Sequence, residues 1–343
     1  MTDAHGHAAV VLPALDEVSV RQFGVFTTAQ ALAAGYSRDE VRAHLRTRRW
    51  QRLRRGVYCS AETRAAVPDT AVHRLECAAV LLSLGCPVAV SHASSAFVHG
   101  LVVPAGALAE VRLTDPDDWR TGRGYRVSRA QLPPDQTVRW GPFTATSVPR
   151  SLVDCAREWR LPDAVAAMDD ALHRRLLTPE ELHEVVLGQR HWEGIAGAAR
   201  AAGLADGRAE SPLESFGRVQ IATSGLPVPE LQVEVWDRSG FIGRVDAWYE
   251  DAAVAIEFDG AAKYSDPWRG RTPAEVLWAE KRREDRLRAT GVRPLRWTMG
   301  DIGSGWATSR DRLRGLLATP YAGRRAFRLV RTPRSSAGAA RPA

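Results

Sequence analysis

Three carboxylates interrupt two apolar segments in the C-terminal third of the chain. Asp246 lies within residues 243–248, and Glu257 and Asp259 lie within residues 253–259. Because the side chains of a strand alternate between its two faces, Glu257 and Asp259 are expected to point to the same side. Ionised carboxylates in a sheet need a compensating charge, and such oxygen ligands suit Mg²⁺ or Mn²⁺. The three acids therefore predict a metal site, which could polarise a phosphodiester and activate an attacking water.

Lysine is scarce in this chain, and both lysines fall in one short stretch beside these acids. Among 47 basic residues, only Lys263 and Lys281 are lysines. A compact ammonium can orient a water, or stabilise charge that develops on a phosphate, where a broad guanidinium cannot substitute. Lys263 and Lys281 are therefore candidate catalytic partners of the carboxylates.

Hydrophobic periodicity predicts the elements that would position these side chains. Helices are expected at residues 210–223 and 273–290, and strands at 231–236, 243–248, 253–259 and 292–298. The resulting order is helix, three antiparallel strands, helix and strand. It indicates a mixed sheet flanked by helices.

The same acids also have a purely structural interpretation. Asp246 and Asp259 could be turn or edge residues, paired with Arg244 or Arg283. The two interpretations differ in what balances the carboxylate charge, which is a metal ion in one and arginine in the other.

Near the N-terminus, residues 10–60 have the signals of two short helices followed by a strand pair. Thr27 with Gln30 and Ser37 with Glu40 each fit a capping box, in which the two side chains bond to each other's backbone amides. Gly35 separates the two helices, and residues 50–58 alternate as a short hairpin. This order predicts a winged helix-turn-helix.

Arginines cluster on both parts of this predicted unit. The second helix carries Arg38, Arg42 and Arg46 at a spacing of four, and the wing carries Arg49, Arg52, Arg54 and Arg55. The pattern predicts a recognition helix in the major groove of double-stranded DNA, with the wing arginines on phosphates. The alternative is a solvated basic face on a protein-interaction module.

The composition is that of a globular protein of two or three domains. The chain has 343 residues and a net charge of +7, which weakly favours a polyanionic partner. No signal peptide or membrane-spanning run is apparent, so cytoplasmic localisation is expected. The cysteines lack zinc-site spacing, and no dimer seam is evident, so the oligomeric state stays open.

The remaining segments are assigned by pattern. The pattern of residues 61–195 predicts a middle α/β domain. Residues 209–320 are expected to form the C-terminal domain. Residues 196–208 are small and polar, which indicates a linker, and 321–343 indicate a disordered basic tail. Asp169 and Asp170 are expected on a solvated helix face or at a cap.

Two stretches of the C-terminal domain resemble a known nuclease superfamily. "RVDAWYEDAAVAIEFDGAAKY" and "EKRREDRLRATGVRPLRWT" are similar to restriction-endonuclease-like proteins of the P-D-(D/E)-x-K type. The likeness is to the very-short-patch-repair-like branch, which includes the domain of unknown function 559 group. It implies a mixed sheet flanked by helices.

This resemblance also implies roles for individual residues. Asp246 and Glu257 would bind the metal, and Glu214 matches an acid often found on the first helix. Asp259 stands where many relatives carry the motif lysine, so this chain reads E-x-D in place of E-x-K. One of the two lysines would then have to supply the ammonium.

The first part of the chain resembles a different family. "GVFTTAQALAAGYSRDEVRAHLRTRRWQRLRRGVY", "SHASSAFVHGL" and "TSVPRSLVDCA" are similar to AbiEi-type antitoxins of type IV toxin–antitoxin systems. The resemblance covers roughly residues 15–190 and implies DNA binding, repression and a cognate toxin as candidate partner.

Three hypotheses follow from these patterns. In the first, the protein is a metal-dependent DNA endonuclease, or a nuclease-like protein, that its winged helix targets to DNA. In the second, it is an antitoxin-like repressor whose nuclease fold is degenerate, and in the third it is a protein-binding scaffold. Arginines that neutralise the carboxylates would favour the second hypothesis.

Overall fold

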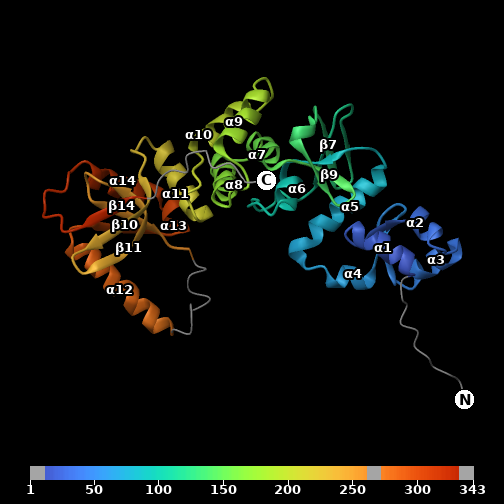
Figure 1. Ribbon diagram of the computed structural model, residues 1–343, viewed down its shortest axis with the longest axis horizontal. Helices are drawn as coiled ribbons and strands as arrows, with labels where there is room; N and C mark the ends of the chain where they lie inside the picture. The colour runs from blue at the N-terminus through green and yellow to red at the C-terminus, as the bar shows by residue number, and fades with distance from the viewer. Residues whose placement is uncertain (1–11, 261–271, 332–343) are drawn as a thin grey trace, which may run out of the picture. The chain divides into compact units, whose positions relative to one another are not determined.

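The computed structural model describes residues 12–260 and 272–331, and it divides into two compact units at Cys155 and Ala156 (Figure 1). It has several sheets and many helices, so the predicted mixed α and β class is confirmed. The unit boundary falls inside residues 61–195, which the sequence predicts as a single domain. Among the described residues, no helix has the length and apolar character needed to cross a membrane.

Unit 1 begins with three helices and a small sheet. These are α1 (Pro13–Arg21), β1 (Val25–Thr27), α2 (Thr28–Ala33), α3 (Arg38–Arg46), β2 (Trp50–Arg54) and β3 (Val57–Ser60). The strands are antiparallel in the order β1-β3-β2. Both predicted capping boxes are present, at Thr27 with Gln30 and at Ser37 with Glu40. They satisfy free amides at the helix starts and so fix where α2 and α3 begin.

The rest of unit 1 surrounds a six-stranded sheet in the order β6-β7-β5-β4-β9-β8. Its strands are β4 (Ala89–Val90), β5 (Val111–Asp115), β6 (Arg120–Gly122), β7 (Tyr125–Arg129), β8 (Thr137–Trp140) and β9 (Phe143–Thr146). Its helices are α4 (Ala61–Ala66), α5 (Val72–Leu84), α6 (His92–Val98) and α7 (Val148–Ala156), with 3-10 turns at Asp69–Ala71 and Pro134–Gln136. The β5–β7 and β4–β9 pairs are parallel, and the others are antiparallel.

The serine- and histidine-rich helix α6 is a structural element with a buried polar network. Ser151 Oγ donates to Ser95 Oγ at 2.9 Å, and Ser95 Oγ donates to the Thr146 carbonyl at 3.0 Å. His99 Nε2 also bonds the Thr146 carbonyl, at 2.8 Å. Because buried polar groups are costly when unpaired, these bonds hold α6 against β9 and α7.

This network makes the stability of unit 1 depend on pH. Burial lowers the pKa of His99, so the folded state favours the neutral imidazole. Its contribution to stability is therefore complete above the unfolded-state pKa of about 6.5 and is lost as the pH falls below it. Between pH 6 and pH 5, protonation of His99 should lower the free energy of unfolding of the wild type by up to about 1.4 kcal/mol per pH unit. We expect His99→Gln to lose this contribution to the slope. Urea titrations of both proteins across that range measure it, and parallel slopes would contradict it.

The two sheets of unit 1 are joined by an aromatic contact and a hydrogen bond. Phe23, which precedes β1, stacks on Trp140 of β8 with ring centroids 4.4 Å apart. Arg54 Nη1, at the end of β2, donates to the Arg123 carbonyl in the β6–β7 turn at 2.8 Å. The β2–β3 hairpin is thus fixed to the larger sheet.

Unit 2 continues with helices and then a second sheet. Its helices are α8 (Leu161–His173), α9 (Pro179–Gly188), α10 (Ile195–Leu204), α11 (Pro212–Thr223), α12 (Pro273–Ala289), α13 (Met299–Ile302) and α14 (Trp306–Leu317). Its strands are β10 (Glu230–Asp237), β11 (Gly240–Tyr249), β12 (Val254–Phe258), β13 (Arg293–Trp297) and β14 (Arg328–Arg331). The sheet order is β13-β12-β11-β10-β14, and only the β12–β13 pair is parallel. The predicted order of helix, three antiparallel strands, helix and strand is confirmed.

Alternation along β12 builds two cores, one on each face of this sheet. Ile256 and Phe258 belong to the core that α11, α13 and α14 cover, and Ala255 belongs to the core on the α12 side with Leu287. Helix α11 passes so close to β12 that a Cβ at Gly217 would lie 2.0 Å from Phe258 Cε1. Residue 257 consequently faces α12.

Two predicted irregular segments are ordered instead. Residues 196–208 are not a linker, because this alanine-rich stretch favours a helix and α10 buries Ala198 and Ala201. Residues 321–331 are not a disordered tail, because β14 pairs with β10 and the Tyr321 and Phe327 rings pack on the core beside α12. The remainder of the predicted tail, 332–343, lies outside the described residues.

Asp169 is also placed differently from the prediction. It lies on the buried side of α8 with 1% exposure, and its Oδ2 accepts from Arg218 Nη2 at 2.6 Å and from Ser215 Oγ at 2.7 Å. Its Oδ1 accepts from the Asp206 amide at 2.7 Å. Burial raises the pKa of Asp169, and the Arg218 charge opposes that shift. By contrast, Asp170 pairs with Arg174 at the surface.

Candidate functional site

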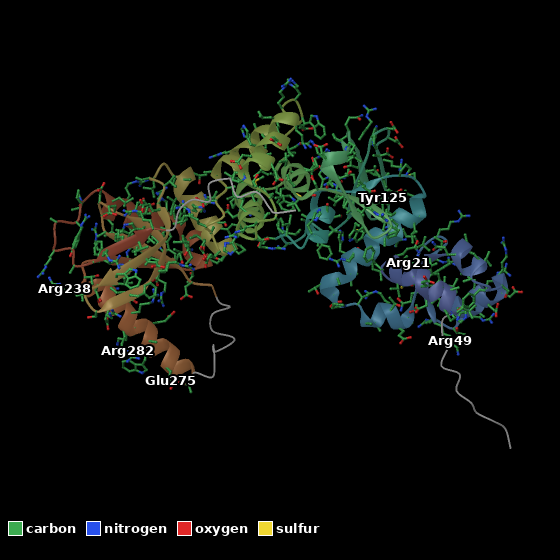
Figure 2. All side chains as sticks on the ribbon, in the orientation of Figure 1. Arg21, Arg49, Tyr125, Arg238, Glu275 and Arg282 are labelled. Carbon is green, nitrogen blue, oxygen red and sulfur yellow. The ribbon has the colours of Figure 1, made fainter. Side chains whose placement is uncertain are left out.

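Helix α3 and the β2–β3 hairpin present a group of exposed arginines, here called the N-terminal basic surface. It consists of Arg38, Arg42, Arg46, Arg48, Arg49, Arg52 and Arg55. Across residues 13–61, nine arginines face only four carboxylates, so this part of the chain is strongly positive. Figure 2 labels Arg49 on this part of the molecule. Sequence reasoning overlooked Arg48, although it lies in the same arginine run.

The hydrophobic side of α3 sets the orientation of these arginines. Val41 is the buried residue of α3. The His44 ring of the same helix stacks on the Trp50 ring of β2, with ring centroids 4.7 Å apart. Burial lowers the pKa of His44, and the nearby Arg49 charge adds to that shift. A neutral His44 ring can pack tightly against the indole, so α3 and the hairpin are held as one rigid scaffold.

Within the surface, Arg42 has a carboxylate partner. Its Nη1 lies 2.8 Å from Asp39 Oδ1, and both side chains are well exposed. Solvent-exposed pairs at this helical spacing contribute little free energy. The Arg42 guanidinium can therefore exchange Asp39 for another anion at small cost.

Arg54, which the sequence placed with the exposed wing arginines, is half-buried in the structure. Besides its bond to the Arg123 carbonyl, its guanidinium carbon lies 5.5 Å from the centroid of the Tyr125 ring. The register of β2 and β3 shifts between Arg52 and Arg54, so the strand alternation is interrupted there. Burial lowers the pKa of Arg54. This half-buried side chain ties the hairpin to the β6–β7 turn, and its contact with DNA stays a prediction.

A second group of charges, here called the carboxylate–arginine cluster, surrounds the end of β12. It comprises Asp246, Glu257, Asp259, Glu280, Arg283 and Arg296. Of the three acids predicted from the sequence, Glu257 and Asp259 both lie beside Arg296, and Asp246 lies on the neighbouring strand β11. Asp246 Oδ2 accepts from the Phe258 amide at 2.7 Å, which ties β11 to β12.

Arginines hold the acids of this cluster. Arg283 from α12 donates to both oxygens of Glu257, with Nη1–Oε1 at 2.6 Å and Nη2–Oε2 at 2.7 Å. Arg296 lies opposite Glu257 in the β12–β13 register. Its Nη2 is 3.6 Å from Glu257 Oε2, and its Nη1 is 3.6 Å from Asp259 Oδ2 and 3.2 Å from Glu280 Oε2. Glu257 and Asp259 retain only 13% and 12% side-chain exposure. Two guanidinium groups therefore offset part of the negative charge of this largely buried cluster.

The other candidate residues are not brought to these acids by the described structure. Lys281 is exposed on α12, and its Nζ lies 5.5 Å from the centroid of the Trp278 ring. Glu214 caps α11, since its carboxylate accepts from the Glu210 amide and from Ser211 Oγ, and it also accepts from Gln232 Nε2. Lys263 lies outside the described residues.

As arranged, the cluster does not fit a divalent cation. Both Glu257 oxygens accept from the bidentate Arg283, so a metal at this carboxylate would compete with a close ion pair. Across residues 12–260 and 272–331, no group of three or more His, Cys, Asp or Glu side chains could hold a metal. The Mg²⁺ or Mn²⁺ site stays a prediction, whereas the pairing with Arg283 matches the structural alternative. Arg244 instead pairs with Glu210, at 2.6 Å.

Comparison with known proteins gives a class for the N-terminal segment. Residues 13–61 match the family model described as "Transcriptional regulator, AbiEi antitoxin". The match covers α1 to β3 and the N-terminal basic surface. This segment is therefore AbiEi-antitoxin-like, as the sequence resemblance predicts, and the family suggests a DNA-binding regulatory role.

Individual relatives come from Mycobacterium tuberculosis. "Uncharacterized protein MT2308" of strain CDC 1551 / Oshkosh and "Uncharacterized protein Rv2248" of strain ATCC 25618 / H37Rv are each 35% identical over 158 residues. That alignment is 46% of this chain and 54% of each relative, so the chain spans about half the length of the curated relatives it matches. The crystal structure of the RV2827C protein has 16% identity and a TM-score of 0.36, covering 65% of this chain and 88% of that one.

Proposed function

We propose that the N-terminal part of unit 1 is a winged helix-turn-helix that binds double-stranded DNA, and that the protein is a transcriptional regulator of the AbiEi antitoxin type. The observation that carries this proposal is the N-terminal basic surface on a rigid scaffold of α3 and the hairpin. An α-helix fits the major groove of B-DNA, so α3 would read base edges there. The hairpin arginines Arg52 and Arg55 would contact phosphates, which fixes register and contributes most of the affinity.

A cognate toxin and a cytoplasmic location belong to the same proposal, because they follow from a regulator of this type. In unit 2, Arg283 and Arg296 pair with Glu257 and Asp259, which are two of the three acids that the nuclease hypothesis requires. The carboxylate–arginine cluster thereby supports the regulator among the hypotheses raised from the sequence.

The proposal is tested by DNA binding of the full chain, measured by fluorescence anisotropy with duplexes from its own upstream region and from a random pool. The triple variant Arg46→Ala, Arg52→Ala, Arg55→Ala is expected to bind its best duplex about 10- to 100-fold more weakly at moderate salt. Its log–log salt dependence should be shallower by about 2–3, because each lost phosphate contact removes about 0.9 from that slope.

A matched control removes the same charge from exposed positions of unit 2. The triple variant Arg190→Ala, Arg200→Ala, Arg312→Ala should retain wild-type duplex affinity within about 2-fold, since it changes net charge but no residue of the N-terminal basic surface. Equal losses in both triple variants, or no binding of any duplex by the wild type, would overturn the proposal.

A further inference from the structure

Helix α12 has an outward face that nothing else in the described structure covers. Its inward residues Arg283 and Leu287 face the sheet, while Trp278, Lys281 and Arg282 are exposed. Trp278 is 62% exposed, and the Lys281 ammonium lies 5.5 Å from its ring centroid. An exposed indole beside cations is uncommon on a solvated helix, which is usually polar on its outer side.

The β10–β11 hairpin extends this face. Arg286 of α12 donates to both carboxylate oxygens of Asp237 at 2.9 Å, and also to the Phe241 carbonyl at 3.4 Å. These bonds fasten the hairpin turn to α12. They bring the exposed Arg238 next to the helix, and Figure 2 labels Arg238 and Arg282 in the same part of unit 2.

Cations outnumber available carboxylates over this surface, here called the α12 face. Its exposed cations are Arg238, Lys281 and Arg282, and its exposed carboxylates are Glu275 and Asp285. Two further acids are already neutralised, since Asp237 pairs with Arg286 and Glu284 pairs with Arg288. The α12 face therefore combines a positive charge with the accessible indole ring of Trp278.

We propose that the α12 face binds single-stranded nucleic acid. Proteins that hold single strands combine cations along the phosphate backbone with aromatic rings on which unpaired bases stack. Trp278 would stack with a base, while Arg238, Lys281 and Arg282 would contact the phosphates. A duplex has its bases already stacked on each other, so the exposed Trp278 ring favours a single strand. This binding is separate from duplex recognition by the N-terminal basic surface.

The experiment measures anisotropy and tryptophan fluorescence of the full chain with an oligo-dT probe at low salt. Trp278→Ala is expected to weaken oligo-dT binding about 5- to 100-fold, because one stacked base is lost. Trp278→Phe should keep affinity within a few-fold, since a ring is retained. The matched control is Trp119→Ala, which removes an equally exposed indole from unit 1 and should leave oligo-dT affinity unchanged.

Further arms separate the alternatives. An oligo-rU probe of the same length distinguishes a preference for DNA from one for RNA, and binding of either by way of Trp278 supports the proposal. The N-terminal triple arginine variant should lose duplex binding yet keep oligo-dT binding, which separates this inference from the proposed function. If Trp278→Ala weakens duplex and single strand equally, or if neither oligonucleotide binds the wild type, the proposal is overturned.

Discussion

Replacing Asp169 with asparagine is expected to destabilise unit 2 by about 3–5 kcal/mol. The substitution keeps the side-chain volume but removes the charge that balances Arg218, which is only 6% exposed in its salt bridge. A buried guanidinium without its carboxylate keeps most of its desolvation cost, and the remaining amide cannot restore the ion pair. Since Asp169 also accepts from Ser215 and from the Asp206 amide, the loss would loosen the packing of α8 on α11.

The neighbouring carboxylate provides a matched control. Asp170→Asn breaks a more exposed pair with Arg174 at helical spacing, and it should cost less than about 1 kcal/mol. Urea unfolding followed by hydrogen exchange in peptides of α8 and α11 reports on this unit specifically. Equal losses from Asp169→Asn and Asp170→Asn would show that burial of the ion pair does not matter. The double variant Asp169→Leu, Arg218→Met should recover much of the stability, because no charge is then buried alone.

Replacing Arg283 with methionine is expected to destabilise the sheet of unit 2 by about 3 kcal/mol, because Glu257 loses both of its strongest hydrogen bonds. This figure lies at the low end for buried pairs, since the Arg283 side chain keeps 26% exposure and Arg296 remains nearby. Arg288→Met is the control. It removes an exposed pair with Glu284 from the same helix and should cost less than about 1 kcal/mol.

The same cluster decides between ion pairing and metal binding. In the double variant Arg283→Met, Arg296→Met, the carboxylates of Glu257, Asp259 and Glu280 lose these cations. Mn²⁺ should then restore stability by about 2.7 kcal/mol at a hundredfold excess over its Kd. Wild-type protein should show no Mn²⁺-dependent shift in its urea midpoint. A shift in the wild type, or plasmid cleavage that needs Mg²⁺ or Mn²⁺ and disappears in Glu257→Gln, would reinstate the nuclease hypothesis.

Local patterns in the sequence predicted the elements of both ends well. The capping boxes at Thr27 and Ser37 depend on side chains three residues apart, so they can be read without the fold. Strand alternation likewise predicted that Glu257 and Asp259 share a side, and both side chains lie 3.6 Å from Arg296. Residues 196–208 show the limit of composition, because small residues suit a linker and a packed helix equally well.

Contacts between distant residues could not be predicted in the same way. Arg218 lies 49 residues from Asp169, and Arg283 lies 26 residues from Glu257. The electrostatic requirement of the acids was clear from the sequence, but a metal ion and a pair of guanidinium groups both satisfy it. Only the register of β12 with β13 and the rotation of α12 select the arginines. The direction of Arg54 depends similarly on a register shift that no local signal announces.

The contact of Arg54 with the β6–β7 turn has a thermodynamic consequence. The hairpin that carries Arg52 and Arg55 is tied to the six-stranded sheet next to its turn, by the bond of Arg54 to the Arg123 carbonyl, while Phe23 before β1 stacks on Trp140. If the proposed DNA binding and a ligand of that sheet both depend on this contact, each must alter the affinity for the other by the same factor. The hydrogen bond of Arg54 is thus a contact through which such reciprocal coupling could pass within unit 1.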